Sequence, residues 1–151
     1  MAEITKDQIY SWLEEVKDPE IPVLSLVDLG VITDITVAGT TVKIDITPTF
    51  VGCPALDMMQ SDIREVLRQK GMQKIEIAVS YKNPWTSDRI SHKGKQALKK
   101  FGLSPPPPRQ LFSELEMLEH AVCPRCGNVN TQLRNTFGPT LCRSIHYCND
   151  C

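Results

Sequence analysis

The C-terminal 29 residues contain five of the six cysteines, and this crowding constrains the fold more than any other feature. "CPRCG" (Cys123–Gly127) and "CNDC" (Cys148–Cys151) are two CxxC pairs with 21 residues between them. Two residues between cysteines let both sulfurs of a tight turn face one ion, so two such turns provide four thiolates in a tetrahedron. "TQLRNTF" and "RSIHY", between the pairs, alternate enough to predict two short strands. The tail is therefore predicted to be a zinc ribbon.

The identity of the ligands has a second interpretation. Cys123, Cys126, Cys142 and His146 also form a plausible set, but we prefer the symmetric one, Cys123, Cys126, Cys148 and Cys151. Cys142 is then a spare thiol and His146 a residue on a strand face. The metal is expected to be zinc, which stabilises a module too small for its own core. An iron–sulfur or redox site stays open as the alternative, because iron–sulfur clusters are also held by four cysteines.

Composition bounds the remaining possibilities. The chain has 151 residues, a net charge of -1, 41% hydrophobic and 23% charged residues, which suits one ordinary domain plus a small module. The charge does not suggest a nucleic-acid binder. No apolar run reaches the roughly 18 residues of a membrane span, and the N-terminus has no pattern of a secretory signal. We therefore expect a cytoplasmic protein, in which cysteines stay reduced and serve as ligands rather than in disulfides.

The first hundred residues predict a small α+β layer, a short sheet with helices on one face. Thr5 and Gln8 form a capping box for a helix that ends at Asp18-Pro19. Two alternating runs follow, and then a helix with Pro54 at its first position, a third strand and a third helix. The expected order is helix, strand, strand, helix, strand, helix. The apolar faces are Ile9, Trp12, Leu13 and Val16; Val31, Thr33, Ile35 and Val37; Val42, Ile44 and Ile46.

A run of four prolines in "SPPPP" marks a domain boundary, because polyproline spaces two units semi-rigidly. The predicted organisation is an α+β domain over residues 1–104, a linker over 105–109 and the ribbon module over 110–151. Leucines at helical spacing in "RQLFSELEMLEHAV" predict a short helix after the linker.

The remaining cysteine, Cys53, stands alone between a predicted strand and a predicted helix. At the N-cap of that helix, free N–H groups and the helix dipole would favour its thiolate, which binds soft metals. The alternative is a buried cysteine that packs as a small hydrophobe. Three acidic residues, Asp18, Glu20 and Asp28, flank the apolar loop before the first strand; each is either a cap or solvated charge, or part of one site with Cys53.

Two of these segments carry a resemblance. "DPEIPVLSLVDLGVI" (18–32) and "TPTFVGCPA" (47–55) resemble the hallmark segments of the iron–sulfur assembly family that includes SufT, and the match covers roughly residues 5–104. The linker and the double-CxxC tail are similar to the phenylacetate-degradation branch of that family, PaaD. The resemblance implies a small α+β domain that is often dimeric. It also implies that Cys53 is a cluster ligand, with Glu20 and Asp28 as accompanying motif residues.

The resemblance further implies a function. Members of this branch accompany the multicomponent phenylacetyl-CoA epoxidase, so we expect an accessory factor that is not itself an enzyme. It would carry a transient iron–sulfur cluster to the oxygenase or its iron–sulfur reductase. Because a cluster needs about four protein ligands, a homodimer or the partner would complete the set around Cys53.

Two other functions remain open on the residues alone. The first is a docking module with a structural zinc ribbon, in which Cys53 is only packed. The second is a thiol enzyme that uses Cys53. We disfavour the enzyme because the sequence shows no base and orienting residue to activate the thiol.

Overall fold

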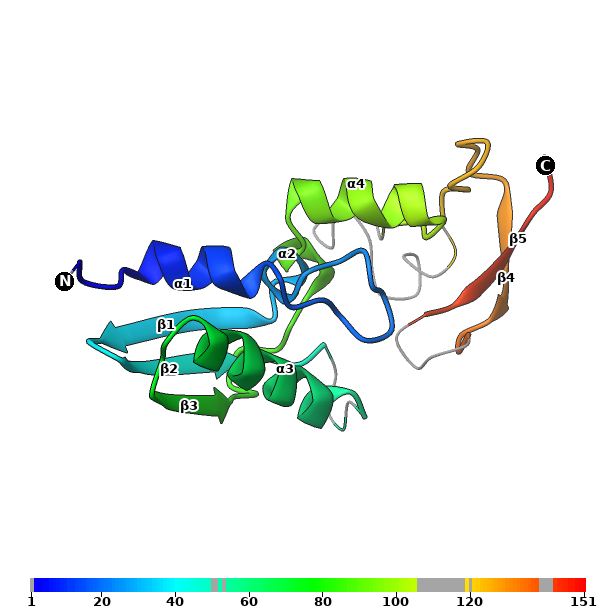
Figure 1. Ribbon diagram of the computed structural model, residues 1–151. Coiled ribbons are helices and arrows are strands. Elements are labelled where there is room, and N and C mark those ends of the chain that lie inside the picture. Colours follow the sequence, from blue (N-terminus) through cyan, green and yellow to red (C-terminus); the bar gives the residue numbers. More distant parts are fainter. Residues whose placement is uncertain (1, 50–51, 53, 106–118, 120, 139–142) are drawn as a thin grey trace. The chain divides into compact units, whose positions relative to one another are not determined.

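The computed structural model describes residues 2–49, 52, 54–105, 119, 121–138 and 143–151 (Figure 1). The chain divides into two compact units, residues 1–85 and residues 86–151. The first unit contains α1 (Lys6–Leu13), α2 (Leu26–Leu29), β1 (Ile32–Ala38), β2 (Thr41–Ile46), α3 (Leu56–Gln69) and β3 (Lys74–Val79). The second contains the 3-10 turn η1 (Ser87–Arg89), α4 (His92–Phe101), β4 (Thr131–Asn135) and β5 (Ile145–Cys148). The predicted order of helices and strands is confirmed, with the four-residue α2 in addition.

The sheet of the first unit has the order β1-β2-β3. β1 and β2 are antiparallel, whereas β2 and β3 are parallel, so α3 forms the crossover between them. α1 packs against β1 and α3, and α3 packs against β3. Most of the predicted apolar residues of these elements are buried, while Trp12 and Val37 are half-buried. The core includes Ile9, Leu13, Val42, Ile44, Ile46, Met59, Ile63 and Leu67. This core supports the loops that leave the sheet at its two ends.

Local signals place α1 correctly at its beginning but not at its end. The hydroxyl of Thr5 accepts the N–H of Gln8, and the Gln8 side chain accepts the N–H of Thr5, which is the predicted capping box. The helix ends at Leu13, five residues before Asp18, because the chain turns there to bring Val16 into the core. Pro19 therefore lies after the end of α1 and does not terminate the helix.

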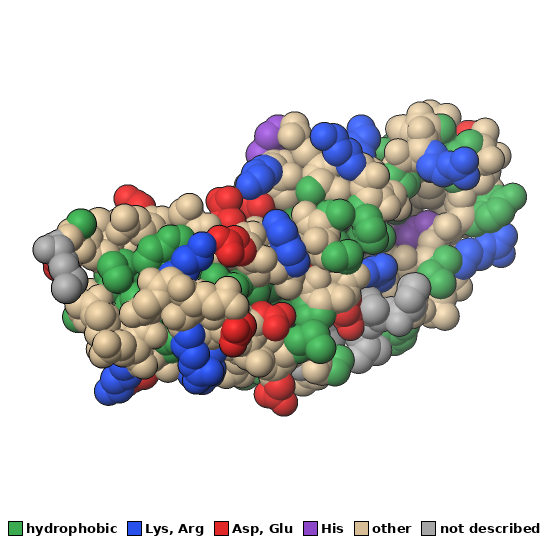
Figure 2. Space-filling view, viewed as in Figure 1, with side chains coloured by type: hydrophobic (Ala, Val, Ile, Leu, Met, Phe, Trp, Pro, Cys, Tyr) green, Lys and Arg blue, Asp and Glu red, His purple; other side chains and the backbone are tan. Residues whose placement is uncertain are grey.

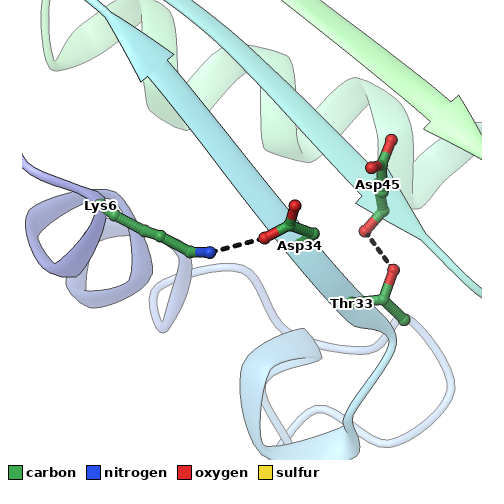
Figure 3. Close-up of polar contacts among 4 residues, drawn as sticks. All are labelled: Lys6, Thr33, Asp34 and Asp45. Carbon is green, nitrogen blue, oxygen red and sulfur yellow. Dashed lines mark hydrogen bonds and ion pairs between the residues drawn. The ribbon is translucent and has the colours of Figure 1, made fainter.

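One residue of a predicted sheet face is misplaced: Thr33 is exposed, whereas Val31 and Ile35 are buried as predicted and Val37 is half-buried. A β-bulge between Ile32 and Asp34 shifts the alternation of β1, so that Ile32 and Ile35 are buried and Thr33 is exposed. Thr33 donates its hydroxyl to the carbonyl of Asp45 at 3.0 Å, and Asp34 faces Lys6 of α1 (Figure 3). The bulge depends on the pairing with β2, which alternation along one strand does not reveal.

The beginning of α3 also differs from expectation. The helix starts at Leu56 with Ala55 as the N-cap, so Pro54 lies before the helix and not at its first position. Cys53 is two residues before the cap, and its own placement lies outside the described residues. The N-cap of this helix is therefore Ala55 and not Cys53, so the helix dipole gives no reason to expect a thiolate at position 53.

The second unit contains the third predicted helix and the ribbon. In α4, the hydroxyl of Ser91 accepts the N–H of Gly94 at 2.9 Å, and Gly102 ends the helix with φ of 96°. β4 and β5 are antiparallel and confirm the two strands predicted between the CxxC pairs. The helix predicted over residues 109–122 falls largely outside the described residues. Acidic and basic side chains are interspersed over the face seen in Figure 2, as the net charge of -1 suggests.

Candidate functional site: a four-cysteine cluster and a motif loop

The described residues contain one group of side chains that can hold a metal ion: Cys123, Cys126, Cys148 and Cys151. Their four sulfurs lie within 4.8 Å of one another. The Sγ atoms of Cys123 and Cys151 are 3.7 Å apart, and those of Cys126 and Cys148 are 3.6 Å apart. Zinc–sulfur bonds of about 2.3 Å in a tetrahedron require sulfurs about 3.8 Å apart. The donor set and its spacing thus fit a tetrathiolate metal ion.

The turn of the first pair is held by backbone hydrogen bonds. The N–H of Gly127 donates to the carbonyl of Cys123, and the N–H of Cys123 donates to the carbonyl of Asn128, both at 2.9 Å. Gly127 has φ of 78°, a conformation that side chains disfavour, so the glycine after the second cysteine permits the turn. The tight turn brings backbone N–H groups toward both sulfurs of this pair.

These N–H groups and the neighbouring thiols set the ionisation of the cluster. Backbone hydrogen bonds from Cys126 and Arg125 lower the pKa of the Cys123 thiol to about 6. The hydrogen bond with Cys123, followed by those with the other two thiols, raises the pKa of Cys151 to about 12. One thiolate is therefore stable by itself, whereas four close thiolates repel one another. A divalent cation removes that repulsion, so ligation and loss of the thiol protons are coupled.

The alternative ligand set is not assembled among the described residues. The Nε2 atom of His146 lies 2.9 Å from the Ser144 hydroxyl, and His146 is not part of the cluster. Burial lowers the pKa of His146, which favours the neutral ring. Cys142 lies outside the described residues.

In the first unit, Asp18 organises the loop that carries the first motif. It is buried, and its Oδ1 atom accepts the N–H groups of Glu20 and Ile21 at 2.8 and 2.9 Å. Its own N–H donates to the carbonyl of Leu24 at 2.8 Å, which closes the loop. Asp18 is thus a turn residue, while Glu20 lies on the turn that it forms.

Asp28 is the third residue of the short helix α2, whose N-cap is Ser25. The buried hydroxyl of Ser25 accepts the N–H of Asp28 and donates to its Oδ2 atom, both at 3.0 Å. The indole N–H of Trp85 donates to the carbonyl of Leu29 at 2.8 Å and so fixes the end of the same helix. Sequence patterns give no sign of this hydrogen bond, because its partners are 56 residues apart.

The two motif segments meet where the sheet ends. The N–H of Thr47, the first residue of "TPTFVGCPA", donates to the carbonyl of Val31 in "DPEIPVLSLVDLGVI" at 2.8 Å. Thr47 is buried, and Gly52 has φ of 79°. The structure thus joins the two motifs through Val31 and Thr47. The expected convergence of Glu20 and Asp28 on Cys53 stays a prediction, because Cys53 lies outside the described residues.

None of the described helices has both the length and the apolar content that crossing a bilayer requires.

Two family models match the chain, one over the α+β unit and one over the ribbon with the four-cysteine cluster. The family described as "Iron-sulfur cluster assembly protein" matches residues 6–79, and the "PaaD zinc beta ribbon domain" matches residues 107–151. The chain therefore belongs to the PaaD branch of the iron–sulfur cluster assembly family.

Individual relatives agree with this assignment. The chain is 33% identical over 144 residues to an Escherichia coli K12 protein that carries the provisional name of a 1,2-phenylacetyl-CoA epoxidase subunit, covering 95% of this chain and 86% of that protein. It is 33% identical over 101 residues to the "Fe-S protein maturation auxiliary factor YitW" of Bacillus subtilis, covering 65% of this chain and 97% of that protein. A DUF59 domain of unknown function from Bacillus anthracis has a TM-score of 0.58 at 33% identity, covering 62% of this chain and 90% of that structure.

Proposed function

We propose that this protein is a non-catalytic accessory factor of a phenylacetyl-CoA epoxidase, which assembles an iron–sulfur cluster or delivers it to the oxygenase and its iron–sulfur reductase. The observation that carries the proposal is similarity over 95% of the chain to a protein named as an epoxidase subunit, with both the assembly domain and the ribbon present. Relatives of the assembly domain alone are named as maturation auxiliary factors. In this proposal the cluster is cargo.

Cys53 is the proposed cluster ligand, with Glu20 and Asp28 as accompanying residues. Support comes from the hydrogen bond between Thr47 and Val31, which holds the segment leading to Cys53 beside the loop that bears both acidic residues. One cysteine cannot retain a cluster, so a second copy of this chain or the recipient completes the ligands. Incomplete ligation suits transfer, because a full set of ligands would retain the cluster.

In the second unit, Cys123, Cys126, Cys148 and Cys151 are proposed to hold a structural zinc ion. A closed set of four thiolates leaves no position for a substrate, which is typical of structural sites. We further propose that the assembly domain spans residues 1–104, followed by a linker over 105–109 and the ribbon module over 110–151. Limited trypsin digestion of the zinc-loaded chain would then cut first after Arg109, at the end of the linker.

Anaerobic reconstitution tests the proposal for Cys53. Wild type, Cys53→Ser and the matched cysteine control Cys142→Ser are supplied with iron and sulfide, and both elements are counted per chain. We expect uptake by wild type and Cys142→Ser but not by Cys53→Ser, and transfer from wild type to the cluster-free reductase. Equal uptake by Cys53→Ser would remove Cys53 from the site.

A docking module is the second candidate, and one observation favours it. The ribbon exposes large apolar side chains, including Val129 at 67%, Phe137 at 58% and Tyr147 at 53%. If docking is the whole function, Tyr147→Ser weakens co-purification with the epoxidase components, while Cys53→Ser leaves reductase maturation unchanged. Loss of maturation in Cys53→Ser would exclude docking as the sole role.

A further inference from the structure

Asn130, the residue just before β4, is hydrogen-bonded to the turn of the second CxxC pair. Its backbone carbonyl accepts the N–H of Asn149 at 3.0 Å. Its Oδ1 atom accepts the Nδ2 group of Asn149 at 3.0 Å, and its Nδ2 group donates to Oδ1 of Asp150 at 3.1 Å. Asn149 and Asp150 are the two residues between the ligands Cys148 and Cys151.

The chemistry of the partners fixes the orientation of the Asn130 amide. An ionised carboxylate only accepts hydrogen bonds, so the NH₂ group of Asn130 must face Asp150. The oxygen then faces Asn149, whose NH₂ group only donates. All polar atoms at this contact are matched, and exchanging the amide oxygen and nitrogen would break two hydrogen bonds.

The next residue, Thr131, makes the link to the other pair. Its hydroxyl donates to the carbonyl of Ala121 at 2.6 Å, two residues before Cys123. In the register of the ribbon, Thr131 also lies opposite Cys148. One dipeptide therefore bonds both the segment that leads into the first CxxC turn and the turn of the second pair.

We infer that Asn130 is a positioning residue for the four-sulfur metal site and sets the second CxxC turn in ligating geometry through Asn149 and Asp150. This inference rests on the proposed zinc site. Asn130 touches no metal and acts through the backbone turn between Cys148 and Cys151. Residues that orient metal ligands typically change metal affinity 10- to 100-fold when they are replaced. Because Asn130, Asn149 and Asp150 are all exposed, we expect the lower end of that range.

The test exchanges donor and acceptor across the contact with Asp150. In full-length Asn130→Asp, two carboxylates face each other, and zinc release into excess chelator should be about tenfold faster than in wild type. In the double variant Asn130→Asp with Asp150→Asn, the new amide donates to the new carboxylate. Asn149 keeps its acceptor, so the release rate should return close to the wild-type value. Asp150→Asn alone keeps an amide oxygen as acceptor, and its rate should change well under tenfold.

The matched control is Gln132→Ala, an exposed amide two residues along the same segment, which should release zinc at the wild-type rate. The ligand-field spectrum of bound Co²⁺ checks that each variant keeps four sulfur ligands. Rescue by the exchanged pair is a result that a general loss of ribbon stability would not give.

A wild-type release rate in Asn130→Asp, or a double variant as fast as the single one, would overturn the positioning role. Failure of the wild-type chain to bind zinc would overturn the proposed metal site itself, and the positioning role with it.

Discussion

The carboxylate of Asp18 provides the sharpest test of how the motif loop is held. It is 7% exposed and accepts two backbone N–H groups through a single oxygen, Oδ1, at 2.8 and 2.9 Å. A hydrogen bond to a charged group contributes about 1.5–3 kcal/mol net, and a neutral one about 0.5–1.5 kcal/mol. Asp18→Ala removes both bonds, whereas Asp18→Asn keeps an oxygen at the same position but loses the charge and has an NH₂ group in place of Oδ2.

The expected magnitudes follow from these values. Both donors belong to half-buried residues, Glu20 and Ile21, so water replaces part of what Asp18→Ala removes. We expect this variant to lower the free energy of unfolding by about 2–4 kcal/mol. Asp18→Asn should lower it by about 1–2 kcal/mol, because asparagine also supports this kind of turn.

Urea unfolding followed by tryptophan fluorescence measures the change. Both tryptophans of the chain, Trp12 and Trp85, belong to the first unit, so the signal reports that unit. Asp62→Ala, an exposed carboxylate on α3, is the control and should shift the free energy by less than about 0.5 kcal/mol. An Asp18→Ala variant as stable as this control would refute the reasoning. Equal losses in Asp18→Ala and Asp18→Asn would show that hydrogen bonding through Oδ1 is not what stabilises the turn.

Three further predictions concern the core, the surface and the metal. Ile63→Ala should lower the free energy of unfolding by about 3 kcal/mol in the same assay, because Ile63 is fully buried, while Met58→Ala, exposed on the same helix, should change it little. The hydrogen bond from Lys6 lowers the pKa of Asp34 from 3.8, so this pair stabilises the fold at neutral pH and its effect is lost as the pH falls through the lowered value. Because both side chains are exposed, Asp34→Asn should barely move the urea midpoint at pH 7, and the difference from wild type should disappear at the acid end of a pH series. Removing zinc with a chelator should abolish amide-exchange protection in β4 and β5 but leave the tryptophan-detected transition in place; protection that survives would contradict a metal-stabilised ribbon.

Several features of the fold and the site are predictable from the sequence because their signals are local. The capping box of Thr5 and Gln8 spans four residues and is present as predicted. The alternation of Val42, Ile44 and Ile46 defines the buried face of β2, since β2 is the central strand and the bulge in its pairing with β1 lies on β1. Each CxxC spacing fixes a tight turn of two sulfurs. The two motif segments and the double-CxxC tail also carried the resemblance to the family, and the comparisons with known proteins confirm that family.

Other features exist only once distant segments meet. The bulge that exposes Thr33 comes from the register of β1 against β2, and alternation along β1 alone places Thr33 wrongly on the buried face. The beginning of α3 at Leu56 is set by how the chain leaves the sheet, although Pro54 indicates an earlier start. The carboxylate of Asp18 made it a candidate site residue in the sequence. Its hydrogen bonds to the N–H groups of Glu20 and Ile21 show that it is a turn residue.

The sequence by itself therefore determined the two kinds of module, the pairing of two CxxC turns and the family, because these follow from spacings of a few residues. Only the tertiary structure decided how the pieces are joined. Thr47 reaches Val31 across 16 residues, and Asn130 reaches Asn149 and Asp150 across 19 and 20. Hydrogen bonds of this kind leave no periodic pattern in a sequence, since each is made by one pair of atoms that the packed elements bring within about 3 Å.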